Sequence, residues 1–367
     1  MEGQSTRPTT PETLIQGGRV DMKSLFDLVM VQKASDLLLT AGAPPLLRVN
    51  GELKATDYPM LSPEDNKRLV YSILSDKQKE QFEETRELDM SIGVSGGHRF
   101  RVNVYMQKGC VAAALRAIPE RIPGLEELGL PKIVPKLAFR PQGLILVTGP
   151  TGHGKTTTQA AMIDLINSHK RCHIITVEDP IEYVHHHQKS VVDQRELGSD
   201  TLSFPGALKY VLRQDPDVIL IGEMRDLETI SSALTAAETG HLVIATLHTN
   251  DAIQTVDRIV DVFPSHQQQQ IRIQLALSML AVISQRLLPR ANGKGRVLAC
   301  EILRNNSAVG NLVREAKSHQ IYSIMETHSK DGMITLDASI KQLYLRGIVS
   351  YDVAVNHVRH PQIIANA

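Results

Sequence analysis

The segment GPTGHGKT, residues 149–156, constrains the fold more than any other part of the sequence. It matches the pattern GxxxxGK[ST] and stands between an apolar stretch, LILV, and a segment of helical character, TTTQAAMIDLIN. When a strand leads through a glycine-rich loop into a helix, backbone N–H groups at the positive helix end can surround phosphates. The sequence therefore predicts a phosphate-binding loop that connects a buried strand to a helix.

The eight residues of this segment and Thr157, which follows it, are expected to bind a nucleotide. Lys155 is placed to reach the β- and γ-phosphates, and the hydroxyl of Thr156 to bind Mg²⁺. His153 fills a variable position of the pattern, so its backbone is expected to matter more than its ring. The expected nucleotide-binding residues are Gly149, Pro150, Thr151, Gly152, His153, Gly154, Lys155, Thr156 and Thr157.

Two further apolar stretches end in carboxylates. DVILIGEMRD places Glu223 after a buried strand, where an acidic residue beside a phosphate loop holds Mg²⁺ through water or orients the attacking water. IITVEDPIEY places Glu178 in the same way, just before Pro180, which ends the strand. Phosphoryl transfer to water needs a group that positions or deprotonates the nucleophile. The sequence leaves Glu178 and Glu223 as two candidates for that task.

Histidines stand at both ends of the apolar stretch in ETGHLVIATLHTN, residues 238–250. On a strand that rises about 3.3 Å per residue, His241 and His248 lie roughly 23 Å apart, on opposite faces. One metal ion cannot bind both. His248, at the carboxyl end, is expected near the phosphates, and His241 is expected to be structural or interfacial. The run His185–His187 has no partner at a metal-ligand spacing, so an exposed loop is expected there.

Composition excludes several classes of protein. The formal net charge of the 367 residues is zero, so nothing global indicates nucleic acid or an anionic membrane as a partner. The three cysteines are far apart, which argues against a disulfide framework or a cysteine zinc site. No apolar run approaches the ~20 residues of a membrane helix. The longest, LALSMLAVIS, is expected to be a buried helix.

Patterning along the chain predicts five segments. The Asn50-Gly51 pair indicates a hairpin, and Ser62 and Ser75 are expected to begin helices. After residue 143, apolar strands alternate with helices, which is typical of a parallel sheet covered by helices. The predicted segments are a flexible tail (1–20), a small α+β domain (21–118), a Pro- and Gly-rich interdomain linker (119–138), a parallel α/β domain (139–290) and a mostly helical region (291–367).

Together these motifs resemble the secretion-superfamily ATPases of type II secretion and type IV pili. VTGPTGHGKTTT is similar to their Walker A segment, TVEDPIEY to their aspartate box, LRQDPDVILIGEMRD to their Walker B segment and TGHLVIATLHTN to their histidine box. The resemblance covers about residues 21–350. Within the superfamily, the compact N-terminal part and ASDLLLTAGAPPLLRVNG resemble pilus retraction ATPases of the PilT and PilU type. The paired-CxxC motif of assembly and secretion members is absent.

The sequence departs from the retraction type at a few positions. Leu38 stands where histidine is usual, and SAVGNLVREAK carries Val309 and Gly310 in place of isoleucine and arginine. An accessory or divergent paralogue therefore stays open, as does a pilus-assembly or type II secretion ATPase. A DNA-translocating RecA-like motor is a further alternative, against which the neutral charge argues. A non-hydrolysing nucleotide-binding adaptor is another, against which Lys155 and Glu223 argue.

The resemblance implies a RecA-like P-loop domain, a smaller N-terminal PAS-like domain and a helical C-terminal region. It implies a homo-hexameric ATPase that uses ATP and Mg²⁺, with the metal held by Thr156 and, through water, by Glu223. Arg101 and Arg116 of the PAS-like domain are implied to reach the γ-phosphate bound by a neighbouring subunit. The implied catalytic residues are Glu178, Glu223, His248, Arg101 and Arg116.

The resemblance also implies a place in the cell. The motor would power pilus retraction, and so twitching motility, through domain movements that ATP binding and hydrolysis drive. It would be cytoplasmic and peripherally associated with the inner membrane at the pilus base. Its implied partners are an inner-membrane platform protein and, as a further candidate, a second retraction ATPase. Neither nucleic acid nor a direct membrane span is expected.

Overall fold

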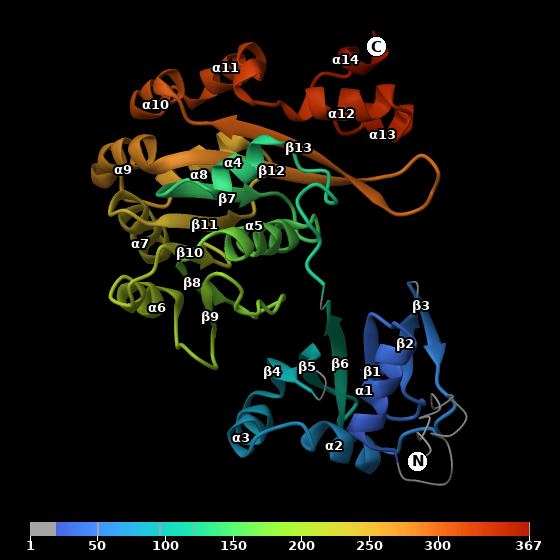
Figure 1. Ribbon diagram of the computed structural model, residues 1–367. Helices are drawn as coiled ribbons and strands as arrows, with labels where there is room; N and C mark the ends of the chain where they lie inside the picture. Colours follow the sequence, from blue (N-terminus) through green and yellow to red (C-terminus); the bar gives the residue numbers. More distant parts are fainter. Residues whose placement is uncertain (1–19, 50, 95–96, 120, 367) are drawn as a thin grey trace, which may run out of the picture. The chain divides into compact units, whose positions relative to one another are not determined.

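The protein is known from a computed structural model, which describes residues 20–49, 51–94, 97–119 and 121–366 (Figure 1). Contacts between residues divide the chain into two compact units, residues 1–120 and residues 121–367. Each unit has its own sheet and its own hydrophobic core. The predicted tail, 1–20, lies outside the described residues except for its last residue.

The N-terminal unit is a six-stranded antiparallel sheet with the strand order β3-β2-β1-β6-β5-β4. Phe26 lies against Phe100 of the sheet, with ring centroids 4.6 Å apart. The side chains of Ser62 and Ser75 cap two helices, which confirms both predicted helix starts. The elements are α1 (Met22–Val31), β1 (Asp36–Leu39), β2 (Leu46–Val49), β3 (Glu52–Ala55), α2 (Pro63–Tyr71), α3 (Asp76–Thr85), β4 (Glu87–Gly93), β5 (Arg99–Gln107) and β6 (Cys110–Ile118).

The C-terminal unit is built on a seven-stranded sheet with the order β13-β12-β7-β11-β10-β8-β9. Every neighbouring pair is parallel except β12 and β13, which form an antiparallel hairpin. All residues of β7, β10 and β11 are buried, which explains their continuous apolar sequences. The strands are β7 (Gly143–Thr148), β8 (His173–Glu178), β9 (Val191–Glu196), β10 (Val218–Ile221), β11 (Leu242–Leu247), β12 (Met279–Pro289) and β13 (Arg296–Arg304).

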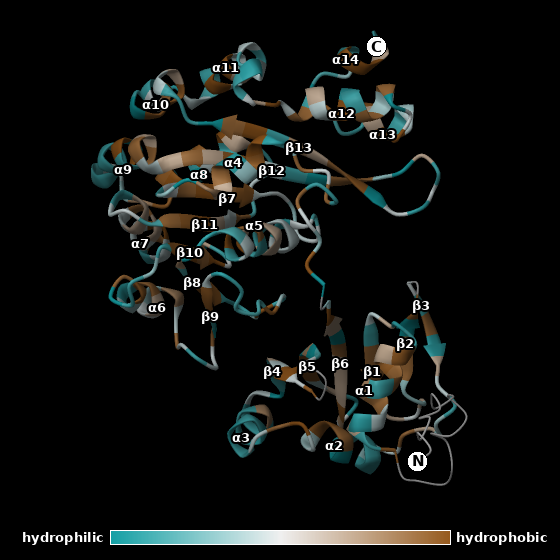
Figure 2. Cartoon of the chain, viewed as in Figure 1, coloured by the Kyte–Doolittle hydropathy of each residue, from teal (hydrophilic) through white to brown (hydrophobic). Residues whose placement is uncertain are grey.

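Helices cover both faces of this sheet. One core joins the sheet to α4 and α5, and another joins the opposite face to α6 through α10. Figure 2 shows the strands between these layers as predominantly hydrophobic. The helices are α4 (Ile133–Ala138), α5 (Lys155–His169), α6 (Phe204–Val211), α7 (Leu227–Glu238), α8 (Ala252–Asp261), α9 (Ser265–Ser278), α10 (Ser307–Arg314), α11 (Ile321–Thr327), α12 (Leu336–Leu345), α13 (Tyr351–Val355) and α14 (Gln362–Ala365), with 3-10 turns at Ser318–Gln320 and Ser329–Asp331.

The apolar segment LALSMLAVIS is not one buried helix, so that prediction was wrong. Its first four residues end α9, and β12 begins at Met279 and runs parallel to β7. A fully buried strand and a buried helix are both uniformly apolar, so periodicity cannot separate them. Residues 279–284 form a strand because β7 has backbone N–H and C=O groups on that side that need hydrogen-bond partners, and parallel pairing with β12 supplies them.

Most of the Pro- and Gly-rich segment 119–138 packs with the C-terminal unit. Leu125, Leu130, Val134 and Leu137 are buried in the core that also contains α5. The division between the two units falls at residue 120 instead. The prolines and glycines of this segment therefore shape turns that lie on a core, besides connecting two domains.

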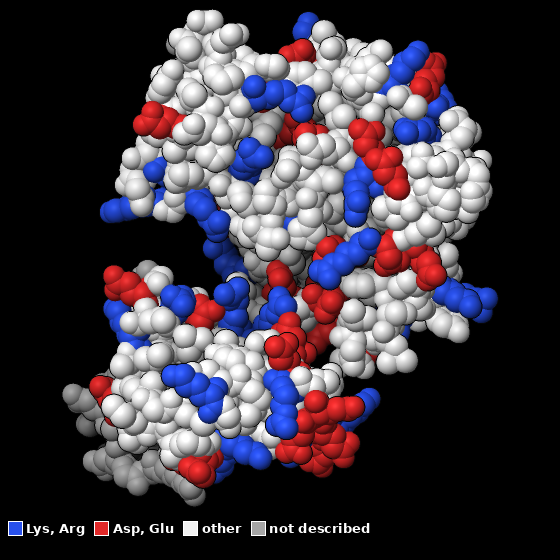
Figure 3. All heavy atoms as spheres, turned by 180° about the vertical axis from the view of Figure 1, so that it is seen from behind, with Lys and Arg blue, Asp and Glu red and all other residues white. Residues whose placement is uncertain are grey.

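Charged residues of both signs are distributed over the surface. On the face that Figure 3 presents, acidic and basic side chains are interspersed on each unit. This agrees with the equal totals of 40 basic and 40 acidic residues. Within the described ranges, no helix has both the length and the hydropathy needed to cross a membrane.

Candidate functional site

The phosphate-binding loop connects β7 to α5 at the carboxyl edge of the parallel strands (Figure 1). At Gly149, φ is +137° and a Cβ atom would lie 2.4 Å from the carbonyl oxygen of Gln285 on β12. Only glycine therefore allows the chain to leave β7 so close to its neighbour. The first N–H groups of α5 have no partner within the helix, which leaves them available to phosphate oxygens.

Lys155 is held inside this loop. Its ammonium group donates hydrogen bonds to the carbonyl oxygens of Gly149, at 2.8 Å, and Pro150, at 3.1 Å. Burial lowers the pKa of Lys155, and the carboxylates of Glu223 and Glu182 act in the opposite direction. The side chain is thus folded over the loop that a phosphate group would enter, close to two carboxylates that favour its positive charge.

The hairpin of β12 and β13 supports the loop from outside. The ring Nδ1 of His153 accepts a hydrogen bond from the backbone N–H of Leu287 at 2.9 Å, and Arg296 donates to the carbonyl oxygen of Gly152 at 3.1 Å. Burial, followed by the charge of Arg286, lowers the pKa of His153, which keeps Nδ1 available as an acceptor. The ring of His153 therefore has a structural contact, in addition to the expected role of its backbone. Its hydrogen-bond partner, Leu287, is 134 residues away in the sequence, so the spacing of residues within the motif could not predict this contact.

Glu223 and His248 meet at the ends of neighbouring strands, β10 and β11. The Nε2 atom of His248 lies 3.0 Å from Oε1 of Glu223, while Oε2 pairs with Arg225 at 2.7 Å. Burial acts to raise the pKa of Glu223, but Arg225 and His248 outweigh it and hold the pKa below its ordinary value. The Nδ1 atom of His248 lies 3.5 Å from the ammonium of Lys155. The fold thus brings Lys155, Glu223 and His248 into one cluster.

His241 lies at the opposite end of β11 from His248. Its Nδ1–H donates to the carbonyl oxygen of Ala236 at 2.9 Å, which ties the start of the strand to the last turns of α7. The histidine run 185–187 is not a uniformly exposed loop, so that expectation was wrong for His185. This residue is buried, and burial followed by the charge of His186 lowers its pKa to about 4. In the described part of the chain, no group of three or more His, Cys, Asp or Glu side chains could hold a metal ion.

Glu178 is buried at the carboxyl end of β8, next to β10. Its Oε1 atom accepts hydrogen bonds from the hydroxyl of Thr176, at 2.6 Å, and from Nε2 of Gln194, at 3.1 Å. Burial raises the pKa of Glu178 to about 7, although both hydrogen bonds act to lower it. Thr176 begins the TVEDPIEY segment, but no role was expected for it, and Gln194 lies outside the motifs quoted from the sequence. The signal that marks them is polar residues at alternate positions of β8 and β9, where the rest of the face is apolar.

Thr156 and Thr157 follow Lys155 in the first turn of α5, and both are partly exposed. The hydroxyl of Thr157 lies 3.1 Å from that of Tyr183, in the loop after β8. Mg²⁺ prefers oxygen ligands and keeps several waters, so it needs only one or two protein groups beside the phosphates. The hydroxyl of Thr156 and the ionised carboxylate of Glu223 fit that donor set, and three clustered ligands are not required.

Arg101 and Arg116 lie in the N-terminal unit, directly opposite each other on β5 and β6. Arg101 pairs with Asp89 at 2.7 Å. Arg116 pairs with Asp36 at 2.9 Å, and its side chain is 74% exposed. Both guanidinium groups therefore lie at the surface of one sheet, and each has a carboxylate partner within its own unit.

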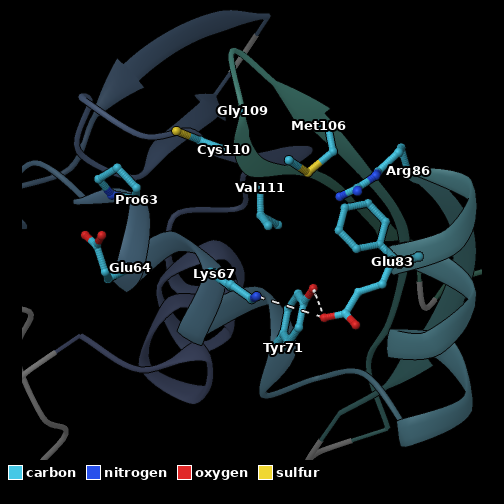
Figure 4. Close-up of a pocket in the computed structure, with 11 residues that line it drawn as sticks. Pro63, Glu64, Lys67, Tyr71, Glu83, Arg86, Met106, Gly109, Cys110 and Val111 are labelled. Atoms are coloured by element: carbon cyan, nitrogen blue, oxygen red, sulfur yellow. Dashed lines mark hydrogen bonds and ion pairs between the residues drawn. The ribbon is translucent and has the colours of Figure 1, made fainter.

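A separate cavity of about 430 Å³ lies within the N-terminal unit (Figure 4). Its walls come from α2, α3 and the turn between β5 and β6. On one side Lys67 stacks over the ring of Tyr71, 4.8 Å from the ring centroid, and the hydroxyl of Tyr71 donates to Glu83 at 3.1 Å. Because none of the phosphate-loop residues lines it, this cavity does not belong to the site around Lys155.

Known proteins share the fold and the motifs. The family described as Type II/IV secretion system protein matches residues 30–354. The type IV pilus retraction ATPase PilT of Pseudomonas aeruginosa is 47% identical over 94% of this chain and 99% of its own length. The type IV pilus ATPase PilU of the same organism is 42% identical over 92% of this chain and 88% of its own length.

A crystal structure of the pilus retraction motor PilT with bound ADP superposes with a TM-score of 0.89. It is 51% identical in sequence and covers 95% of this chain and 100% of the other. The match extends over both units and over every motif described above. The chain therefore belongs to the type II/IV secretion system protein family.

Proposed function

We propose that this protein is an ATP-hydrolysing motor that powers the retraction of type IV pili. The observation that carries the proposal is the convergence of Lys155, Glu223 and His248 beside the phosphate loop. The ring of His248 lies 3.5 Å from the ammonium of Lys155 on one side and 3.0 Å from the carboxylate of Glu223 on the other. This cluster supplies a phosphate-binding cation, a carboxylate and a histidine at one edge of the sheet. PilT of Pseudomonas aeruginosa, which is similar over nearly its whole length, is named as a retraction ATPase.

Glu178 is the proposed general base, and Glu223 the proposed Mg²⁺ residue. A base works best when its pKa lies near the working pH, and that of Glu178 is about 7. Glu223 has a lowered pKa and pairs with Arg225, so it is ionised and a weak proton acceptor. Bound Mg²⁺ supplies charge stabilisation at the phosphates. His248, between Glu223 and Lys155, then detects whether the γ-phosphate is present.

The motor is proposed to act as a homo-hexamer. Arg101 and Arg116 of one subunit reach the nucleotide of the next, where a planar guanidinium pairs with phosphate oxygens. Their present carboxylate partners, Asp89 and Asp36, are exchanged for phosphate during that step. We propose that the ring lies in the cytoplasm, peripherally associated with the inner membrane at the base of the pilus, and passes force to an inner-membrane platform protein. A second retraction ATPase is a further proposed partner.

The direct test of the active site is steady-state ATP hydrolysis by the purified protein. Lys155→Ala removes the phosphate-binding cation, and turnover is expected to fall by a factor on the order of 10² or more. Lys170→Ala is the matched control, because Lys170 follows the last turn of the same helix and its ammonium group contacts the carbonyl oxygens of Phe139 and Arg140 and the ring of Phe139, away from the phosphate loop. Turnover at the wild-type rate in Lys155→Ala would rule out this site.

The proposed arginine contact is tested by comparing two substitutions in one ion pair. Arg101→Ala is expected to lower hydrolysis by about 10-fold or more, with no loss of oligomer in size-exclusion chromatography with light scattering. Asp89→Asn removes the partner of Arg101 but leaves the arginine, so its activity is expected to stay within a few-fold of wild type. If both variants lose activity to the same extent, the ion pair matters and the phosphate contact does not. If both keep wild-type activity, Arg101 has no role in hydrolysis.

An accessory retraction role is the second candidate. It is favoured by Gly310, which stands in α10 at a position where the retraction type has arginine. A Cβ atom at Gly310 would meet no atom closer than 3.5 Å, so packing does not require glycine there. The two roles separate in cells. If this protein is the principal motor, its deletion leaves extra pili that do not retract, whereas loss of an accessory subunit leaves some retraction.

A further inference from the structure

Gln194 on β9 connects three separate parts of the active-site region. Its Nε2 atom donates to Oε1 of Glu178 at 3.1 Å and to the carbonyl oxygen of Tyr183 at 2.8 Å. Its Oε1 atom accepts from the backbone N–H of His185 at 2.7 Å. One amide thus uses both of its N–H groups and its carbonyl oxygen. It holds a carboxyl group and two points of the 179–190 loop in fixed positions.

The sheet places Gln194 there. The register of β8 and β9 pairs Thr176 with Gln194 and Glu178 with Glu196. Side chains at alternate positions share a face, so Thr176, Glu178 and Gln194 all lie on the face that α5 covers. The parallel register of β8 and β9 by itself therefore places Gln194 beside Thr176 and Glu178.

The 179–190 loop also contacts the nucleotide-binding helix. The hydroxyl of Tyr183 lies 3.1 Å from that of Thr157, directly after the proposed Mg²⁺ residue Thr156. The backbone of the same Tyr183 is fixed by Gln194. Contacts therefore run without a break from α5 through this loop to the carboxyl group of Glu178.

We propose that Gln194 is a positioning residue, which orients the carboxyl group of Glu178 and ties that orientation to the 179–190 loop and so to the nucleotide-binding helix. The inference rests on the proposed role of Glu178 as the general base. Gln194 does not itself contact the reacting atoms. It acts through the hydrogen bond to Glu178, which is strongest when Glu178 is ionised and ready to accept a proton from water.

The electrostatic surroundings make the effect measurable. Glu178 is buried, and burial disfavours its ionised form. The titratable and charged groups on the elements around this face include Asp179, Glu182, Tyr183 and His185 in the following loop, Glu196 on β9, Glu223 and Arg225 after β10, and Lys155 at the start of α5. Loss of the Gln194 donor therefore removes one of the few interactions that favour ionisation of Glu178.

The test is the pH profile of kcat for ATP hydrolysis, between about pH 5.5 and 9, for wild type and Gln194→Met. Methionine has a similar length and no hydrogen-bonding amide. The acid limb is expected to move up by about one pH unit, the scale of one hydrogen bond to a charged group. At pH 7 the variant is then about 5-fold slower, because the ionised fraction of Glu178 falls from about one half to about one tenth, and it recovers toward the wild-type rate near pH 9. The KM for ATP is expected to change little.

Two further variants make the result decisive. Gln188→Met removes an amide from the same loop, where Gln188 contacts Asp164 and not Glu178, so its pH profile is expected to match wild type. Gln194→Glu keeps the shape and the acceptor for His185 but places a second carboxyl beside Glu178. It is expected to move the acid limb further up, because two adjacent carboxyl groups resist ionising together. It serves in place of Gln194→Met if that variant does not fold.

The outcomes separate this inference from the proposed function. A uniform loss of kcat at all pH values, or an unmoved acid limb in both Gln194 variants, overturns the positioning role. Glu178→Gln is the reference for the base. If it keeps wild-type turnover, the assignment of Glu178 as base fails and the Gln194 inference fails with it. If Glu178→Gln is inactive while the Gln194 profiles are unchanged, only the Gln194 inference is wrong.

Discussion

The ends of β8 and β10 carry the same residue type in two different environments. These strands are neighbours in the sheet and run parallel, so Glu178 and Glu223 lie at the same edge. Glu178 is buried among neutral hydrogen-bond donors, and its pKa is raised to about 7. Glu223 pairs with Arg225 and His248, and its pKa is lowered. Position in the sheet brings the two carboxyl groups together, and local partners give them different proton affinities.

The difference indicates a division of work. A carboxyl with a pKa near neutrality can take and release a proton during turnover, whereas one held ionised can bind a cation without titrating. Gly222, just before Glu223, supports this arrangement. A Cβ atom there would lie 3.2 Å from the Cα atom of Glu178, so the absence of a side chain lets the two strand ends approach closely.

The largest expected effect comes from removing the proposed base. Glu178→Gln keeps the size of the side chain and one acceptor, but it cannot accept a proton from water. The kcat for ATP hydrolysis is expected to fall by a factor of about 10² to 10⁴, with ATP binding retained. Steady-state kinetics and equilibrium binding of a fluorescent ATP analogue measure the two quantities. If Glu223→Gln lost turnover while Glu178→Gln did not, the roles of the two strand ends would be reversed.

Glu178→Gln and Glu223→Gln are expected to change the folding stability in opposite directions at pH 8. Because the pKa of Glu178 is raised from 4.5 to about 7 in the fold, its contribution to stability is fully present below pH 4.5 and is lost as pH rises through about 7. Above pH 7 the fold must hold an ionised, desolvated carboxylate. Glu178→Gln is therefore expected to be more stable than wild type at pH 8, by about 3 kcal/mol at most, and similar to it at pH 5.

The contribution of Glu223 to folding stability depends on pH in the opposite direction. Its lowered pKa means that its contribution is present above pH 4.5 and is lost as pH falls below that value. Glu223→Gln is therefore expected to be less stable than wild type at pH 8. Thermal unfolding followed by circular dichroism at pH 5 and pH 8 measures both variants. If the two variants shifted the unfolding temperature at pH 8 by the same amount and in the same direction, the contrast between the strand ends would be contradicted.

The smallest of these effects is expected from the histidines at the two ends of β11. His248→Ala removes the contact between Glu223 and the Lys155 region, and hydrolysis is expected to fall by about 10-fold to 10²-fold, as for other groups aimed at developing charge. His241→Ala removes a hydrogen bond at the far end of the strand, so turnover is expected to stay within about 3-fold of wild type. Equally severe losses in kcat would show that both ends of the strand serve catalysis.

Much of the fold could be predicted because its local patterns agree with its global structure. The short apolar stretches of β7, β10 and β11 alternate with helical segments, which predicts central strands of a parallel sheet. The serine caps of α2 and α3 mark their own helix starts. Prediction failed where one pattern fits two structures. The segment that begins β12 is as apolar as a buried helix, and its pairing partner β7 lies more than 130 residues earlier.

The sequence by itself determined the phosphate loop, because its pattern of glycines, lysine and threonine specifies a strand, a turn and a helix within a few residues. It also determined that Glu178, Glu223 and His248 end strands, and therefore lie at one edge of a parallel sheet. Only the tertiary structure decided which of the two carboxyl groups has its pKa raised and which has it lowered. Burial raises the pKa of Glu178, whereas Arg225 and His248 hold that of Glu223 low. Both environments arise when distant strands pair and exclude water.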